Sequence, residues 1–203
     1  PGVKKRLRIL FVSREYPTST AAGGIGTYTR NCAQGLAQRG HEVHVVCCAH
    51  EPITEEAITI HTTTPGTFPL PQGTALFRLR ALARRLLPES LNRLAWARQA
   101  LSVYRDLTHR HGRFDILEYP ECGAEGTYLA QLTDTTTIVR LHTPWEMVRH
   151  LDKIKQGTLD TRVMHYLESR TTRRSRAVSS PTPGARSTSA SIQEVDLPSV
   201  SLP

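Results

Sequence analysis

Apolar positions along the chain alternate between two spacings. Residues 8–13, RILFVS, form the short continuous apolar run that is typical of a buried parallel strand. From Ile25 to Leu36 apolar side chains recur every three or four residues, as on one helix face, and Gly40 provides a helix stop. Residues 41–48, HEVHVVCC, predict a second strand. This segment therefore predicts a β-α-β unit with a right-handed crossover and a parallel sheet.

The same alternation continues along the rest of the chain. Further strands are predicted at 57–62, 114–119, 136–142 and 177–180. Further helices are predicted at 75–87, 89–111, 123–132, 158–174 and 184–194. Pro88 falls in the first turn of the second of these helices, where proline is tolerated. The pattern predicts one α/β domain over residues 1–203: a doubly wound, mostly parallel sheet with helices on both faces.

A glycine-rich turn, GGIG, directly precedes the first helix and contains Gly23, Gly24 and Gly26. Ligands of doubly wound sheets bind beyond the carboxyl ends of the strands, where this turn is expected to lie. We expect the glycines to permit positive φ and close approach of a ligand. The helix start that follows favours a phosphate or another anion. The alternative is that the glycines serve only tight helix–strand packing, since neither the dinucleotide fingerprint nor the P-loop motif is present.

Four segments resemble, in the same order, the amino-terminal domain of family 4 glycosyltransferases of the GT-B fold. They are FVSREYPTSTAAGGIGTYTRNCAQGLAQRGHEVHVV, FDILEYPECGAEG, IVRLHTPWE and LESRTTRRSRAVSSPTPGARS, which together cover nearly all of the chain. The resemblance implies a two-domain enzyme with a cleft between Rossmann-like halves, of which the first mainly holds the acceptor. The E-x7-E motif of the second half does not occur here. We therefore expect the donor-binding domain to be absent from this chain, and the chain alone to be inactive.

The resemblance also implies roles for single residues. His142, which ends the strand 136–142, is the expected catalytic residue and reaches the donor sugar, and the three glycines approach the donor diphosphate. Polar side chains that follow strands at the same edge are candidates for binding acceptor hydroxyls: Arg14, Tyr16, Glu118, Glu121, Thr143 and Glu146. A structural role for His142 and solvated loop positions for the carboxylates are the alternatives. Trp145 is a candidate for stacking on a sugar ring or for a core position.

Positive charge is concentrated in one part of the chain. The net charge is +8, and nine arginines against two acids fall between Leu76 and Arg113. Such an excess favours an anionic partner. Leucines recur on one side of this stretch, so residues 75–113 are a candidate for contact with an anionic membrane surface. The alternative is a packed helix with a solvated arginine face. Aromatic residues are not interleaved with the basic ones, which argues against nucleic acid.

Other classes of protein are disfavoured by what the sequence lacks. No apolar run approaches the roughly 18 residues that span a membrane. The four cysteines form no C-x-x-C pair, so free thiols are expected rather than a disulfide framework. The histidine spacing predicts no metal site, and no motif of serine hydrolases or metalloproteases occurs. We expect no metal or other cofactor, since the nucleotide-sugar is a substrate, and a cytoplasmic protein that is peripheral to the membrane.

The main hypothesis is the amino-terminal domain of a retaining glycosyltransferase of the hexosyltransferase type. Such an enzyme moves a sugar from a nucleotide-sugar donor to a hydroxyl of a sugar or a lipid-linked acceptor. Two alternatives stay open. One is a nucleotide-dependent Rossmann-like oxidoreductase that uses the GGIG turn, and the other is a non-enzymatic domain that binds a membrane surface.

Overall fold

A computed structural model of the 203-residue chain describes residues 5–17, 23–64, 75–143 and 158–180. Its parallel sheet has six strands in the order β3-β2-β1-β4-β5-β6, which confirms the predicted doubly wound α/β fold. The strands are β1 (Arg8–Val12), β2 (Glu42–Cys48), β3 (Thr59–Thr63), β4 (Ile116–Pro120), β5 (Thr136–Arg140) and β6 (Ala177–Ser179). The helices are α1 (Gly24–Gln38), α2 (Ala75–Leu86), α3 (Pro88–His111), the short 3-10 turn η1 (Cys122–Ala124), α4 (Leu129–Leu132) and α6 (Leu159–Arg174).

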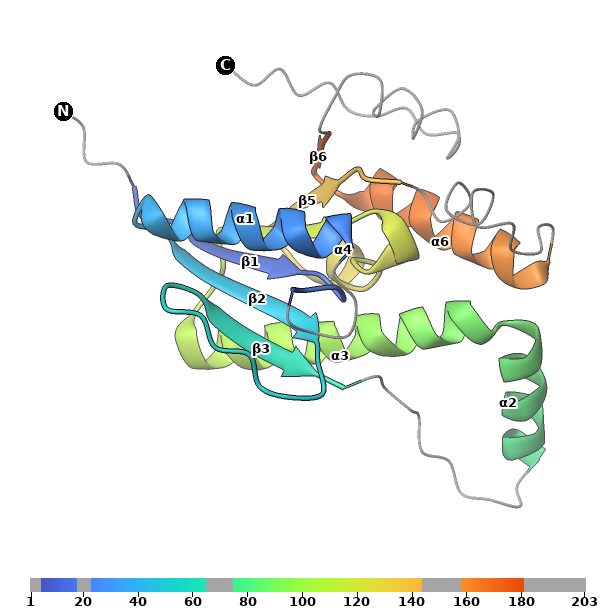
Figure 1. The fold of residues 1–203 in the computed structure, drawn as a ribbon. Coiled ribbons are helices and arrows are strands. Elements are labelled where there is room, and N and C mark those ends of the chain that lie inside the picture. Colours follow the sequence, from blue (N-terminus) through green and yellow to red (C-terminus); the bar gives the residue numbers. More distant parts are fainter. Residues whose placement is uncertain (1–4, 18–22, 65–74, 144–157, 181–203) are drawn as a thin grey trace.

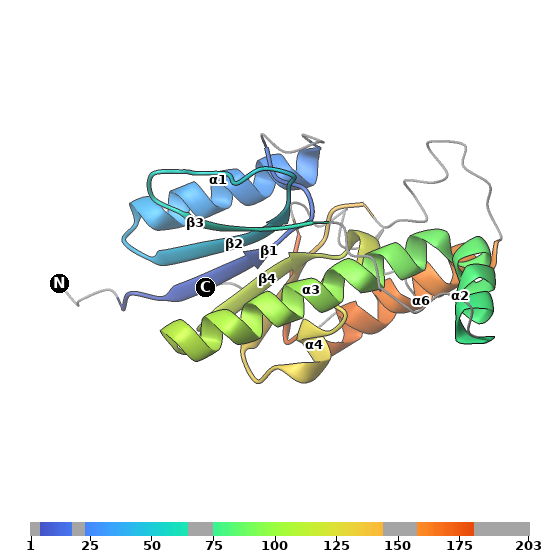
Figure 2. The same cartoon turned by 90° about the horizontal axis from the view of Figure 1, so that it is seen from below.

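Each face of the sheet has its own apolar core. Ile9 and Phe11 of β1 belong to the cluster that packs beneath α1. Leu10 and Val12, which point the opposite way, belong to the cluster that includes Trp96 of α3. Figure 1 shows α1 on one face of the sheet and α3 on the other, and Figure 2 shows α4 and α6 on the same side as α3. Because both faces are buried, the strands appear in the sequence as continuous apolar runs.

The amino end of α3 is held by a carboxylate from α6. Asp160 accepts the N–H of Glu89 at 3.0 Å and the N–H of Ser90 at 2.9 Å, and the Ser90 hydroxyl donates to it at 2.6 Å. These bonds satisfy N–H groups that a helix start leaves unpaired. Pro88 begins the helix, as predicted, at a position where its missing N–H is not needed. The capping carboxylate therefore joins two helices that lie far apart in the sequence.

The predicted helix 123–132 is wrong in its first half. The segment makes the turn η1 instead, and α4 begins only at Leu129. The physical reason is Gly123, whose φ of 76° is left-handed and interrupts a helix. A side chain there would also meet the Arg93 guanidinium, since a Cβ would lie 2.8 Å from Nη1. The other predicted elements within the described residues are present with small shifts at their ends, and the predicted helix 184–194 lies outside those residues.

All four cysteines are free thiols, as expected from their spacing. Cys47 and Cys122 are buried, whereas Cys32 and Cys48 are half-buried. Within the stretches that the structure describes, no helix has both the length and the apolar character to cross a membrane.

Two histidines are packed against each other within the sheet. The His44 ring stacks on that of His61 at 5.3 Å, and His44 Nδ1 lies 3.0 Å from His61 Nε2. His44 is buried and its ring also packs edge-on against Phe114. Burial, followed by the charge of His44, lowers the pKa of His61 to about 4, and burial likewise lowers the pKa of His44. Both rings are therefore held in the neutral form at pH 7.

We predict that the folded state loses stability as the pH falls from 6.5 to 4. An unfolded histidine titrates near pH 6.5, so in this window the unfolded chain binds protons that the folded His61 does not. The contribution is fully present above pH 6.5 and is lost as the pH approaches 4. Chemical unfolding of the chain and of the His61→Gln variant at several pH values checks this. The variant should lose less stability on acidification, whereas His50→Gln, at an exposed position, should behave as the unmodified chain. An identical acid loss in all three proteins would contradict the assignment.

Candidate functional site

The candidate site lies at the carboxyl edge of the sheet, where β1 and β4 are neighbours. The strand order reverses direction at this point, and such switch points are where ligands bind to doubly wound sheets. The loops that follow β1, β4 and β5 meet here, together with the amino end of α1 (Figure 1). The parallel arrangement alone therefore places most of the predicted site residues at one edge of the molecule.

The three glycines of the turn differ in their surroundings. Gly23 is the N-cap of α1 in an extended conformation, and none of the three has the positive φ that we expected. Gly26 is buried against the loop after β1, where a Cβ would lie 3.1 Å from the Glu15 carbonyl carbon and 3.2 Å from Tyr16 Cα. Gly24 is exposed, with open space where its side chain would be. Close packing thus explains Gly26, whereas Gly24 leaves the helix start accessible.

The amino end of α1 lies at this edge of the sheet. Its N-cap has no side-chain hydrogen bond, and its first turn carries no acidic residue. The first N–H groups of the helix have no capping side chain, and together with the positive end of the dipole they favour an anion. The carboxylate of Glu15 lies beside this helix start, since a Cβ on Gly23 would be only 2.2 Å from Glu15 Oε2. A diphosphate at this position must move the Glu15 side chain aside.

A cluster of polar side chains connects α1 to the ends of β4 and β5. The Tyr28 hydroxyl of α1 donates to Glu118 Oε1 at 2.8 Å. The Tyr28 ring packs edge-on against His142, with 5.2 Å between ring centroids, and the Arg140 guanidinium lies 4.4 Å from the centroid of the same ring. A cavity of about 10 Å³ between these side chains has room for no more than one water molecule. The cluster is therefore closely packed rather than an open pocket.

The environment of the cluster changes the acidity of its members. Burial, followed by the charge of Arg140, lowers the pKa of His142 to about 4. Burial raises the pKa of Glu118, while the hydrogen bond from Tyr28 and the charge of Arg140 act against this rise. Burial, followed by the charge of Glu118, also raises the pKa of Tyr28. His142 is consequently a neutral imidazole at pH 7, which can donate one hydrogen bond and accept another.

The structure brings only some of the predicted acceptor-binding residues to an accessible position. Arg14 is half-buried and donates its backbone N–H to Glu125 Oε2 at 2.8 Å. Thr143 is half-buried directly after His142. Tyr16 and Glu121 have no exposed surface, so neither offers an atom to an acceptor in this arrangement. Glu146 and Trp145 lie outside the described residues.

Sequence reasoning missed three residues that the structure places in or next to the site: Tyr28, Arg140 and Glu125. Tyr28 belongs to the apolar face predicted for the helix between Ile25 and Leu36, although its position five residues after Gly23 puts it near the helix start. Arg140 is a charged residue inside an apolar strand run, and such an interruption is itself a signal. Glu125 had no signal of its own, because the segment around it was predicted as an ordinary helix.

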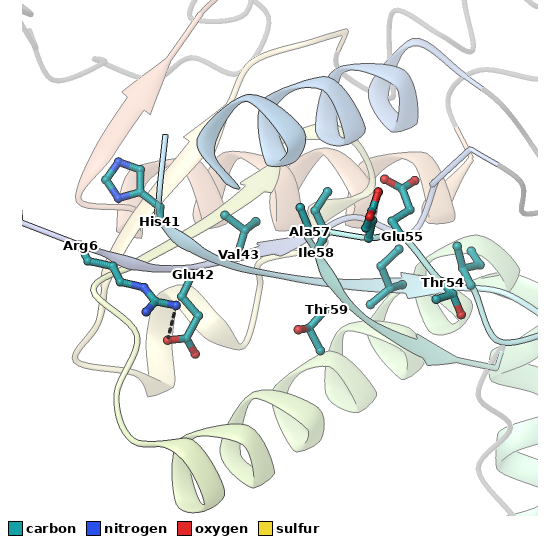
Figure 3. A pocket seen from close by; sticks show the side chains of 12 residues that line it. Arg6, His41, Glu42, Val43, Thr54, Glu55, Ala57, Ile58 and Thr59 are labelled. Carbon is teal, nitrogen blue, oxygen red and sulfur yellow. Dashed lines mark ion pairs between the residues drawn. The ribbon is translucent and has the colours of Figure 1, made fainter. Parts of the chain in front are cut away.

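A larger hollow of about 520 Å³ lies on a different part of the sheet (Figure 3). It is lined by Arg6, His41, Glu42, Val43 and residues 53–60. Arg6 and Glu42 form an ion pair of 4.0 Å at one end. Because β2 and β3 begin here, this hollow is at the amino end of these strands and contains none of the predicted site residues. Within the described residues, no group of three or more metal-ligating side chains is arranged to hold a metal ion.

Comparisons with known proteins agree with this architecture. A sequence model described as glycosyl transferase 4-like domain matches residues 23–196. No curated protein matches the sequence. The structure of Arabidopsis thaliana UGT89C1 complexed with UDP-L-rhamnose is similar at a TM-score of 0.50 and 15% identity, over 88% of this chain and 46% of that one. Glycyrrhiza uralensis UGT73P12 complexed with glycyrrhetinic acid 3-O-monoglucuronide has a TM-score of 0.53 at 12% identity, over 97% of this chain and 49% of that one.

This chain therefore spans about half the length of either structure. At such low identities the likeness concerns the fold alone. Both neighbours are glycosyltransferases of the GT-B fold, which confirms the expected Rossmann-like half of that fold.

We predict opposite effects of adding a methyl group to two neighbouring glycines. Gly26→Ala should lower the free energy of unfolding by about 1–3 kcal/mol, because the new Cβ meets backbone atoms that cannot easily move. Gly24→Ala should leave it unchanged or raise it by about 0.5 kcal/mol, because the space is open and alanine favours the helix. Denaturant unfolding of the two variants measures both changes. Equal effects of the two substitutions would show that packing against the loop after β1 does not explain Gly26.

Proposed function

Because this chain belongs to the glycosyl transferase 4-like domain family, we propose that it is the acceptor-side domain of a retaining glycosyltransferase. The enzyme transfers a hexose from a nucleotide-sugar to a hydroxyl group of an acceptor. A second, donor-binding domain selects the base and the sugar. The proposal includes no metal ion or other cofactor, as the resemblance of the sequence implies.

One observation carries this proposal: the contact between Tyr28 and His142. It joins α1, whose amino end has no capping side chain, to the histidine that follows β5. A diphosphate at the start of α1 and a sugar beside His142 would then be parts of one bound molecule, and the closely packed side chains around Tyr28 must move to admit the sugar. This is the arrangement that a nucleotide-sugar donor requires, with its diphosphate and its reacting sugar at adjacent positions.

In the proposed reaction the bond between the anomeric carbon and the diphosphate oxygen breaks, and the oxygen keeps the electron pair. The helix start of α1 stabilises the negative charge that develops on the diphosphate. The acceptor oxygen forms its bond to the anomeric carbon on the same face, and its proton passes to the departing diphosphate oxygen. His142, held neutral by burial and by Arg140, donates a hydrogen bond to a hydroxyl of the sugar ring.

Among the candidates for binding the acceptor, we keep Arg14, Glu118 and Thr143. Each is half-buried at the carboxyl edge and so retains surface that a ligand can contact. Glu118 already accepts a hydrogen bond from Tyr28 through one oxygen, which leaves acceptor capacity on its carboxylate. Tyr16 and Glu121 are not retained, because both are fully buried.

The helix α2 supports a membrane as the location of the acceptor. Leu82 and Leu86, one helical turn apart, are 53% and 48% exposed. Arg84 and Arg85 are exposed beside them, and Figure 1 shows α2 standing across the end of α3 at the margin of the molecule. Exposed leucines next to arginines suit an interface with anionic lipid. We propose a lipid-linked acceptor and a cytoplasmic enzyme that is peripheral to the membrane.

We predict that His142→Ala lowers kcat for transfer about 100-fold, the effect typical of removing one hydrogen-bond donor from a transition state. The assay uses the enzyme together with its donor-binding domain and follows release of nucleoside diphosphate from a panel of nucleotide-sugars, with the anomeric form of the product read by NMR. His50→Ala, at an exposed position, is the matched control. Full activity of the His142 variant would contradict the assigned role, and an inverted product would contradict the retaining mechanism.

We predict that reversing the charge of Arg84 and Arg85 to glutamate weakens binding to anionic vesicles at least about 30-fold. Each arginine near such a surface contributes about 1 kcal/mol, so the loss of two accounts for this factor, and repulsion of the two new carboxylates adds to it. Co-sedimentation with vesicles of phosphatidylcholine and phosphatidylserine measures the change. The control, Arg105→Glu with Arg113→Glu, makes the same charge change at exposed positions outside α2 and should pellet as the unmodified chain does. Equal pelleting of both variants would remove α2 as the membrane contact.

A further inference from the structure

The segment between β4 and α4 contains two buried glutamates four residues apart. Glu121 is fully buried, and Glu125 is 3% exposed. β4 lies between β1 and β5 in the sheet, so this segment has the loop after β1 on one side and the loop after β5 on the other. The two carboxylates reach in these two opposite directions.

Glu125 holds the loop after β1. Its Oε2 accepts the backbone N–H of Arg14 at 2.8 Å, two residues beyond the end of that strand. Its Oε1 lies 3.6 Å from Nη1 of Arg93 on α3, which is also largely buried. The carboxylate thus fixes where the chain leaves β1 on its way to the GGIG turn.

Glu121 holds the loop after β5. Its Oε1 accepts the backbone N–H of His142 at 3.0 Å. Its own backbone N–H donates to the carbonyl of Arg140 at 3.0 Å. Glu121 therefore forms hydrogen bonds to the residues on both sides of Leu141. These bonds fix the backbone of His142, from which its imidazole extends.

A third buried carboxylate anchors the segment itself. Glu168 of α6, which is fully buried, accepts the backbone N–H of Gly123 at 2.7 Å. The left-handed φ of Gly123 turns the chain at the midpoint between the two glutamates. Thr127 and Thr171 add a hydrogen bond of 3.1 Å between the same segment and α6. The segment between β4 and α4 is therefore anchored to α6, and from this anchored position it holds the loops after β1 and β5.

We propose that Glu121 and Glu125 are positioning residues that set the loops after β5 and β1 at the carboxyl edge, so that His142 and the start of α1 stand at a fixed separation. Leucine at these positions would be buried at less electrostatic cost but would leave the N–H groups of His142 and Arg14 without these acceptors. Burial raises the pKa of Glu125 to about 7, and the charge of Arg93 opposes this rise. The link to sugar transfer rests on the proposed function, whereas the bracing of the two loops does not.

The test compares Glu121→Met, which has similar length but no carboxylate, with Glu121→Gln, which keeps an oxygen acceptor. Amide hydrogen exchange and NMR spectra of the full chain are the readouts. Glu121→Met should speed exchange of the His142 amide about tenfold, the loss expected for one hydrogen bond, and should shift its imidazole signals. Glu121→Gln should restore most of both. The pair Glu125→Met and Glu125→Gln should have the same effects on the Arg14 amide.

A matched control separates local bracing from general loss of stability. Leu107→Ala removes buried apolar contacts near the end of α3 that leads into β4, away from the carboxyl edge. It should speed exchange of core amides such as Val45 without a selective effect on His142. If Glu121→Met speeds exchange of His142 and Val45 equally, or if Gln and Met act alike, the positioning role is overturned.

A measurement on the unmodified chain covers the case in which a Met variant does not fold. A through-hydrogen-bond coupling between the His142 amide nitrogen and the Glu121 carboxyl carbon should be detectable by NMR, and its absence overturns the proposal. In the transfer assay, Glu121→Met should lower kcat and Glu121→Gln should recover part of it. If the unmodified enzyme is inactive although its donor-binding domain is present, the result counts against the proposed function alone, since the exchange and coupling results do not depend on activity.

Discussion

Three glutamates buried beneath the carboxyl edge of the sheet are the constraint on which the candidate site depends. A buried carboxylate without hydrogen-bond donors costs on the order of several kcal/mol, so each must find partners in the fold. Glu121, Glu125 and Glu168 accept backbone N–H groups from the loops after β5, β1 and β4. The same bonds that make their burial tolerable therefore fix the three loops relative to one another.

The consequence for the site is that a helix start and a histidine face one region. The loop fixed by Glu125 leads in sequence to the amino end of α1, and the loop fixed by Glu121 contains His142. Tyr28 of α1 connects these groups, because its ring contacts His142 and its hydroxyl donates a hydrogen bond to Glu118. The dipole of α1, the neutral imidazole of His142 after β5 and the carboxylate of Glu118 on β4 thus lie close together. This convergence is what supports the proposal of nucleotide-sugar chemistry for a member of the glycosyl transferase 4-like family.

The pattern of apolar residues was sufficient to predict the strands and the location of the site at the carboxyl edge of the sheet. It was not sufficient to predict the contacts within the site. The strands are buried on both faces, so each appears as an apolar run, and the parallel order then places His142 at the carboxyl edge. The partners of the site lie far apart in sequence: Tyr28 and Glu118 are separated by 90 residues and Arg14 and Glu125 by 111. The spacing of apolar residues along the sequence cannot predict contacts between residues so far apart. The left-handed Gly123 likewise overrides a helical pattern, and this turn lies midway between the two glutamates of its segment.

The measurement that tests the central claim most directly is an NMR titration of the chain with a panel of nucleotide-sugars, up to millimolar concentration. If the carboxyl edge between β1 and β5 is the binding site, the amides of Gly24, Ile25, Gly26 and His142 should shift together along one binding curve. Shifts confined to the hollow lined by residues 53–60, or no shift at the start of α1, would contradict the account and place the function of this domain elsewhere.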